Sequence, residues 1–116
     1  MVKPKLQPAN ILLEKHLAEL GIPYSKECRF SSERKWQFDY LLCDSTGHSL
    51  RLAVEIEGSV YAQGRHTRGK GFEEDCIKYN TATMMGYRVL RFSTGQVLRG
   101  QAKAFLASFL LTEALK

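Results

Sequence analysis

The sequence has little of what marks disulfide-rich, zinc-binding or membrane proteins. It contains three cysteines, Cys28, Cys43 and Cys76, and none of them stands in a C-x-x-C spacing. Because three cysteines cannot all pair, we expect reduced thiols and neither a disulfide framework nor a zinc site. The longest apolar runs, such as residues 104–112, fall short of the roughly 20 residues that span a bilayer, and residues 1–10 lack the apolar core of a secretory signal. We therefore expect a cytoplasmic protein without a membrane partner.

The composition predicts one ordinary globular domain. Of the 116 residues, 44% are hydrophobic and 25% are charged, which is typical of a soluble domain with a single core. Residues 1–7 carry Lys3 and Lys5 without any periodicity. We therefore expect a flexible basic tail over residues 1–7 and a single domain over residues 8–116.

Positive charge exceeds negative charge in this sequence. There are 17 lysines and arginines against 12 aspartates and glutamates, which gives a formal net charge of +5. Such an excess favours a polyanionic partner, because phosphate contacts supply most of the sequence-independent affinity for nucleic acids. The cations gather in a glycine-rich loop predicted over residues 63–71 and just before a predicted strand. The candidate nucleic-acid contacts are Arg34, Lys35, Arg65, His66, Arg68 and Lys70.

Two glutamates interrupt an apolar run. The segment Leu52–Glu57 reads LAVEIE, a run typical of a buried strand except for Glu55 and Glu57. Residues two apart on a strand point to the same side, so both acids project from one face and Val54 and Ile56 from the other. Neighbouring carboxylates that also lose solvation are costly unless a cation lies between them. The pair therefore predicts a divalent cation such as Mg²⁺, which takes oxygen ligands.

A third acid stands within another predicted strand. Aspartate is depleted in strands, yet Asp39 lies in the run WQFDYLL. Alternation places Trp36, Phe38 and Tyr40 on one face of this strand, and the aspartate on the other. If the strand pairs antiparallel with the strand over Leu50–Glu57, Asp39 lies beside the two glutamates.

The first predicted helix carries one further candidate acid. Its apolar residues follow helical spacing, and Glu14 lies next to that apolar stripe rather than opposite it. Two interpretations stay open for Glu14, a solvated helix acid or a further carboxylate that leans towards the metal site.

The remaining patterns predict the order α-β-β-β-α-β-α. A helix between the third and fourth strands makes those two strands parallel, which gives an α/β fold with a mixed sheet. The predicted helices cover residues 8–20, 71–85 and 99–115, and the predicted strands cover residues 28–30, 35–43, 50–57 and 87–93.

This arrangement resembles the PD-(D/E)XK nuclease superfamily, which includes restriction enzymes, Holliday junction resolvases and the very-short-patch repair endonuclease. The resemblance rests on Asp39, on Glu55-Ile-Glu57 and on the order of elements. More narrowly, VEIEG, a following histidine, Asp-x-x-Lys-Tyr-Asn and GYRVLRF are similar to small single-domain nuclease-like proteins of bacteria and phages, over most of residues 34–97. The resemblance implies a restriction-endonuclease-like core. It also implies a bacterial or phage-encoded DNA endonuclease that uses Mg²⁺, with Mn²⁺ able to substitute.

The resemblance also assigns roles to particular residues. Asp39 and Glu55 would bind the metal, and the carbonyl of Ile56 would complete the set. The third motif position is usually lysine, and here Glu57 occupies it and would be a further metal ligand. The side chains that would supply positive charge or a proton at the phosphate are Lys70, Lys78 and His66.

Several alternatives remain open at this level. Lys78 can pair with Glu74 four residues earlier on the helix instead of reaching the acids. Arg91 can face solvent, the helix carboxylates or DNA. The preferred function is a structure-selective endonuclease that nicks or resolves duplex or branched DNA, and a homodimer would allow two cuts. The other two classes are a nucleic-acid-binding module without turnover and a subunit that binds a protein through the basic face.

Overall fold

The computed structural model describes residues 7–58 and 65–114, and the side chains of residues 65–68 and 112–114 lie outside what it describes. The described chain consists of a helix, three strands, a helix, a strand and two helices. These are α1 (Pro8–Glu19), β1 (Tyr24–Arg29), β2 (Gln37–Cys43), β3 (Ser49–Glu57), α2 (Arg65–Met84), β4 (Arg88–Ser93), α3 (Thr94–Leu98) and α4 (Gln101–Ala114). Among the described helices, none combines the length and the hydropathy that a membrane span requires.

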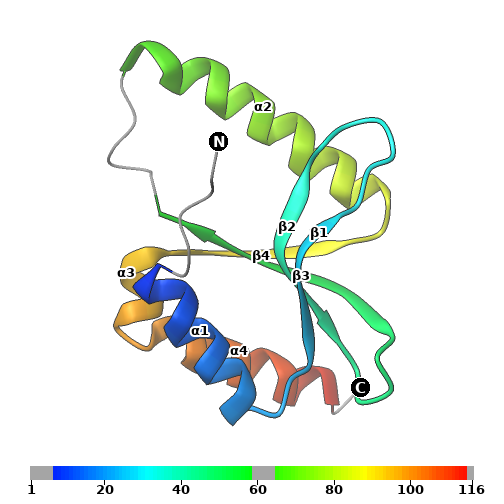
Figure 1. The fold of residues 1–116 in the computed structure, drawn as a ribbon, viewed down its shortest axis with the longest axis vertical. Helices are drawn as coiled ribbons and strands as arrows, with labels where there is room; N and C mark the ends of the chain where they lie inside the picture. The colour runs from blue at the N-terminus through cyan, green and yellow to red at the C-terminus, as the bar shows by residue number, and fades with distance from the viewer. Residues whose placement is uncertain (1–6, 59–64, 115–116) are drawn as a thin grey trace.

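The four strands form one mixed sheet in the order β1-β2-β3-β4 (Figure 1). β1 pairs antiparallel with β2, and β2 pairs antiparallel with β3. β4 pairs parallel with β3, and α2 connects the two. A parallel neighbour needs a long crossover connection, which this helix supplies. The predicted meander and crossover are therefore confirmed, and with them the α/β mixed-sheet class.

Helices cover both faces of the sheet: α1, α3 and α4 lie on one face and α2 lies on the other (Figure 1). The larger core lies under α1, where Leu13 and Leu17 are fully buried in one cluster with Leu52 and Val54 of β3. Residues four apart share a helix face and residues two apart share a strand face, so the sequence spacing produces this contact. Each buried side chain of this size contributes about 2 kcal/mol. The core thereby fixes α1, and the polar side chains that it carries, against the sheet.

The face under α2 holds a smaller, aromatic core. Phe30 and Phe38 stack with their ring centroids 4.1 Å apart, and Tyr87 meets Phe38 edge-on at 5.1 Å. Tyr40 instead lies in the core under α1. The prediction that Phe38 and Tyr40 share a face was therefore wrong. Regular strand alternation is broken between these two residues, at Asp39, whose amide bonds to a side chain.

Two element boundaries at the exposed edges of the fold differ from those predicted. β1 begins at Tyr24 rather than at Cys28. The sequence did not predict this start, because most residues of β1 are exposed at a sheet edge and show no alternation of buried and exposed positions. α2 begins at Arg65 rather than at Gly71, so the predicted loop over residues 63–71 is largely helical. Glycines lower helix propensity by about 1 kcal/mol each without preventing a helix.

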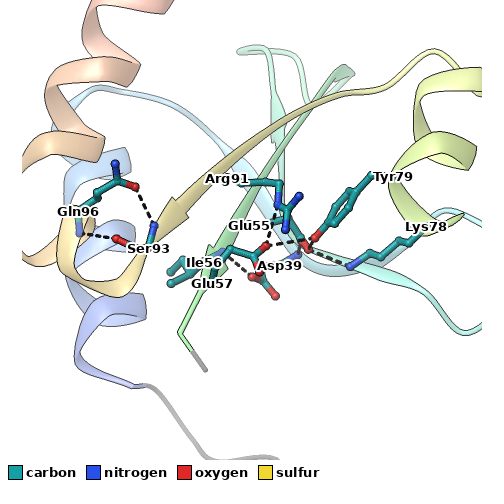
Figure 2. Close-up of polar contacts among 9 residues, drawn as sticks. All are labelled: Asp39, Glu55, Ile56, Glu57, Lys78, Tyr79, Arg91, Ser93 and Gln96. Carbon is teal, nitrogen blue, oxygen red and sulfur yellow. Dashed lines mark hydrogen bonds and ion pairs between the residues drawn. The ribbon is translucent and has the colours of Figure 1, made fainter. Parts of the chain in front are cut away.

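The C-terminal helix is divided in two. Ser93 caps α3 by accepting from the amide of Gln96, whose side chain accepts from the amide of Ser93 (Figure 2). Gly100 then adopts φ +81°, a left-handed conformation that favours glycine, and α4 follows. The prediction of one helix over residues 99–115 therefore missed α3, which borders the site described below.

The cysteines agree with the expectation of reduced thiols. Cys43 is buried, Cys28 and Cys76 are half-buried, and all three are free.

Candidate active site

Asp39 and Glu55 meet where the pairing of β2 and β3 gives way to side-chain contacts (Figure 2). Beyond the backbone pair Tyr40–Val54, the amide of Asp39 donates to Oε2 of Glu55 at 2.6 Å. The amide of Ile56 donates to Oδ2 of Asp39 at 2.8 Å. Each carboxylate thus accepts from the backbone of the opposite strand. The two acids that the sequence predicted to be neighbours lie side by side at this edge of the sheet.

Glu55 is buried, and a cation and two further donors offset the cost of burying its charge. It is 4% exposed. Its Oε1 accepts from Nζ of Lys78 at 2.9 Å and from the hydroxyl of Tyr79 at 2.8 Å. Lys78 therefore contacts an acid of β3 and does not pair with Glu74 on its own helix. Glu74 instead lies 3.7 Å from Arg34. A buried carboxylate is tolerated when a cation and further donors surround it in this way.

Glu57 extends the same network on the α2 face of the sheet. Its Oε2 accepts from Nε of Arg91 at 3.1 Å, and the Arg91 guanidinium lies 4.3 Å from the centre of the Tyr79 ring. Burial opposes the charge of Arg91, but the hydrogen bond to Glu57 and its negative charge outweigh burial and raise the pKa of the arginine. Arg91 therefore neutralises the carboxylate of Glu57. Arg91 was expected to face solvent, the carboxylates of the second helix or DNA. In the structure it contacts a carboxylate, but that carboxylate belongs to β3 and not to α2.

Tyr79 provides a pH-dependent test of this network. Burial, and then the negative charges of Glu55 and Glu57, raise the pKa of its phenol above the ordinary value. A raised pKa in the folded state means that the contribution of Tyr79 to stability is complete below about pH 10 and is lost as the pH rises above it. We expect Tyr79→Phe to lower the free energy of unfolding by about 1.5 kcal/mol at pH 8.

The difference between wild type and Tyr79→Phe should narrow at pH 10.5 and above, as measured by urea denaturation. Tyr87→Phe, which alters a phenol in the aromatic core, is the control. A difference that stays constant from pH 8 to pH 11 would contradict the assigned role of Tyr79.

A pocket of about 550 Å³ borders Asp39 on the α1 side of the sheet. It lies between α1, β1, the ends of β2 and β3, and α3. Besides Gln7 and Tyr40, the pocket is lined by several charged or polar side chains. These belong to Asn10, Glu14, Lys26, Glu27, Asp39 and Thr94. Ile56 and Gly58 also border the pocket, so the end of the acidic strand faces this space.

A chain of hydrogen bonds holds Glu14 at the pocket. The hydroxyl of Tyr40 donates to Oε2 of Glu14 at 2.8 Å, and Nδ2 of Asn10 donates to the Tyr40 oxygen at 3.0 Å. Burial raises the pKa of Tyr40; the hydrogen bond from Asn10 acts in the other direction, and the carboxylate of Glu14 adds to the rise. Tyr40 therefore stays protonated at neutral pH and orients the carboxylate. Glu14 borders the same pocket as Asp39, and its role as a metal ligand stays a prediction.

Sequence reasoning missed the strained residue Glu27. Pairing of β1 with β2 continues on both sides of it, at Lys26–Tyr40 and Cys28–Phe38, so Glu27 lies across from Asp39. Its φ is +53°, in the left-handed region, which costs a residue other than glycine roughly 1–2 kcal/mol. Strain of this kind is concentrated at functional sites. No local sequence pattern marks it, because the conformation is imposed by the sheet.

The predicted cations are spread over different parts of the molecule. Arg34 is exposed and lies 4.9 Å from the centre of the Trp36 ring, and Lys35 is exposed beside it. Lys70 is exposed on α2, eight residues or about 12 Å of helix before Lys78. The structure therefore brings Lys78, and not Lys70, to the acids. The side chains of Arg65, His66 and Arg68 lie outside those described, so their predicted roles have no structural account.

The donor set around Asp39 suits a hard divalent ion with an incomplete protein shell. Among the described residues, no three side chains of His, Cys, Asp or Glu are grouped closely enough to hold a metal. The predicted set of three carboxylates therefore does not form one compact group. Mg²⁺ is usually bound by only one or two carboxylates, with water and phosphate oxygens filling its shell. Asp39 and Ile56 border the pocket, whereas Glu55 lies beside Asp39 without lining the pocket, and both of its oxygens accept hydrogen bonds.

Comparison with known proteins establishes the fold but not the family. No family model matches the chain, and no curated protein matches it. Among solved structures, it is similar to the catalytic domain of the homing endonuclease I-Bth0305I. The two superpose with a TM-score of 0.65 and 20% sequence identity, over 93% of this chain and 97% of that domain. At this identity the likeness shows that the two chains share a nuclease-like α/β fold.

Proposed function

We propose that this protein is a Mg²⁺-dependent DNA endonuclease of the PD-(D/E)XK type, which hydrolyses phosphodiester bonds at the pocket beside Asp39. The observation that carries the proposal is the position of Asp39 and Glu55. They lie together where β2 and β3 cease to pair through their backbones, and Asp39 borders a pocket of about 550 Å³. The fold shared with an endonuclease catalytic domain supports the same conclusion.

Each residue of the proposed site has a distinct task. Asp39, Glu55 and the carbonyl of Ile56 would hold Mg²⁺, which when bound lowers the pKa of a water molecule and polarises the phosphate. The amide of Ile56 orients the Asp39 carboxylate. Lys78 and Tyr79 fix Glu55 and offset the cost of its burial. Tyr40 fixes Glu14 at the pocket, where Glu14 can accept a proton from water.

The chain's net charge of +5 supports DNA as the substrate, because a polyanion gains affinity from it. We further propose that the enzyme selects branched or mismatched duplexes, which it nicks or resolves, and that a homodimer makes paired cuts.

A second candidate function is a nucleic-acid-binding module without turnover. Two observations favour it. Glu57 stands where the resembling superfamily has lysine, and both oxygens of Glu55 already accept hydrogen bonds within the protein. Such a protein would bind DNA in the presence of Mg²⁺ or Mn²⁺ and leave it intact.

Metal removal distinguishes these two functions. We expect the purified protein to nick supercoiled plasmid and to cut a four-way junction in Mg²⁺ or Mn²⁺, to stop when EDTA is added, and to resume when the metal is restored. Gel analysis of labelled strands measures each rate, and an RNA duplex of the same sequence tests the preference for DNA. Tight binding with intact strands in both metals would contradict the nuclease proposal and support the binding module.

A further inference from the structure

We propose that Lys26 of β1 is the cation that contacts the phosphate to be cut, in place of the motif lysine that Glu57 has replaced. This inference rests on the proposed nuclease function and concerns the same pocket. Catalysis of phosphoryl transfer needs positive charge at the phosphate oxygens, where negative charge develops in the transition state. Sequence reasoning assigned that charge to Lys70, Lys78 or His66.

Lys78 is poorly placed for this task. Its ammonium lies 2.9 Å from Glu55, and the side chains of the two residues are 15% and 5% exposed. Moving Lys78 towards a phosphate would leave a buried carboxylate without its cation, which is strongly unfavourable. Lys78 also does not line the pocket that Asp39 borders. The charge of Lys78 therefore stabilises the folded protein by neutralising Glu55.

Lys26 lies in the pocket and is not committed in this way. Among the described residues that line the pocket, it is the one lysine or arginine. Its Nζ lies 3.5 Å from Oε2 of Glu14, and its side chain is 49% exposed. An ion pair of that length and exposure contributes little, so the ammonium can turn towards a ligand at small cost. A lysine ammonium has three donors, of which Glu14 engages at most one in this geometry.

The sheet directs Lys26 towards the site. Lys26 pairs directly with Tyr40 across β1 and β2, and directly opposed residues project from the same face. Tyr40 is buried under α1 and holds Glu14, so Lys26 projects from the α1 face, at the wall of the pocket. Its neighbour in β1, Glu27, lies across from Asp39 in its left-handed conformation. Lys26 is therefore one residue along the strand from the position opposite the metal-binding aspartate.

The test compares Lys26→Met with Lys103→Met. Lys103 also pairs with a glutamate, Glu19, at 2.8 Å, and its side chain is 39% exposed, so the second variant removes the same charge from α4. We expect Lys26→Met to lower kcat for cleavage of a four-way junction about 100-fold, with KM changed less than about threefold, because the charge acts mainly in the transition state. Lys26→Arg should recover activity to within about tenfold of wild type. Lys103→Met should cleave like wild type. Equal kcat for Lys26→Met and Lys103→Met would overturn the inference and leave the nuclease function in place.

A binding measurement keeps the two proposals separable. In metal-free buffer, fluorescence anisotropy should give a plot of log Kd against log salt concentration that is shallower by about 0.9 for Lys26→Met, as expected for the loss of one phosphate contact. Lys103→Met should keep the wild-type slope. If wild type binds but never cleaves, the nuclease proposal fails, and the slope alone then decides whether Lys26 contacts phosphate. An unchanged slope would overturn that contact.

Discussion

Asp39→Asn is expected to abolish metal-dependent cleavage while leaving the fold intact. The substitution removes one negative charge from the proposed metal-binding pair, but asparagine keeps an oxygen that can accept from the amide of Ile56. The amide of residue 39 can still donate to Glu55. We expect the rate of plasmid nicking to fall about 1,000-fold or more, because a hard cation binds a neutral amide much less well than a carboxylate. The thermal midpoint should change by no more than a few degrees.

Three measurements check this prediction. Initial rates at saturating Mg²⁺ give the loss of activity, thermal unfolding followed by circular dichroism tests the fold, and titration calorimetry with Mn²⁺ tests metal affinity. Glu73→Gln, on an exposed part of α2, makes the same change in net charge away from the site. Cleavage by Asp39→Asn within tenfold of wild type would rule out Asp39 as a metal ligand, or would reveal a contaminating nuclease.

Lys78→Met is expected to be the most destabilising single substitution in the acid network. It leaves Glu55 buried without its cation, which typically costs 3–5 kcal/mol, so we expect the free energy of unfolding to fall by about 3 kcal/mol. Lys103→Met is the matched control, because its ion pair has nearly the same length, 2.8 Å, but lies at the surface. Exposed pairs contribute about 1 kcal/mol or less.

The double variant Glu55→Gln with Lys78→Met separates the cost of an unpaired charge from the loss of packing. It removes both charges, so it should recover more than half of the stability that Lys78→Met loses. Chemical denaturation of wild type, Glu55→Gln, Lys78→Met and the double variant completes the cycle. If Lys78→Met lowers the free energy of unfolding no more than Lys103→Met does, Glu55 is neutralised in another way. Lys78 would then again be a candidate for the cation that contacts the phosphate.

Local sequence pattern was most informative where it reflects burial. The alternation in Leu52–Glu57 predicted Val54 and Ile56 on one face and the two glutamates on the other. In the structure the first face packs on the core under α1 and the glutamates contact residues of α2 and β4. The same rule failed in β2, where Phe38 and Tyr40 belong to different cores. It failed at Asp39, where the pairing of β1 and β2 skips Glu27–Asp39 and Glu27 has a φ of +53°.

Long-range geometry decided which charged groups meet. From the sequence, Lys70 and Lys78 were equivalent candidates, and only the position of α2 over the sheet brings Lys78 to Glu55. Tyr79, Arg91 and Lys26 reach these acids or the pocket in the same way, each from an element other than the strands that carry Asp39 and the two glutamates. Their side chains carry no periodic signal, because a polar residue at a site looks like any other exposed polar residue until its partner is known.

The sequence by itself determined the fold class and the acid pair, because hydrophobic periodicity fixes strands, helices and their buried faces, and a carboxylate within a buried run stands out against that pattern. Only the tertiary structure decided that Glu57 is neutralised by Arg91, that Lys78 is committed to Glu55, and that Lys26 and Glu14 share the pocket with Asp39. The physical reason is that electrostatic partners are selected by distance and burial, which depend on how the strands and helices cross in space.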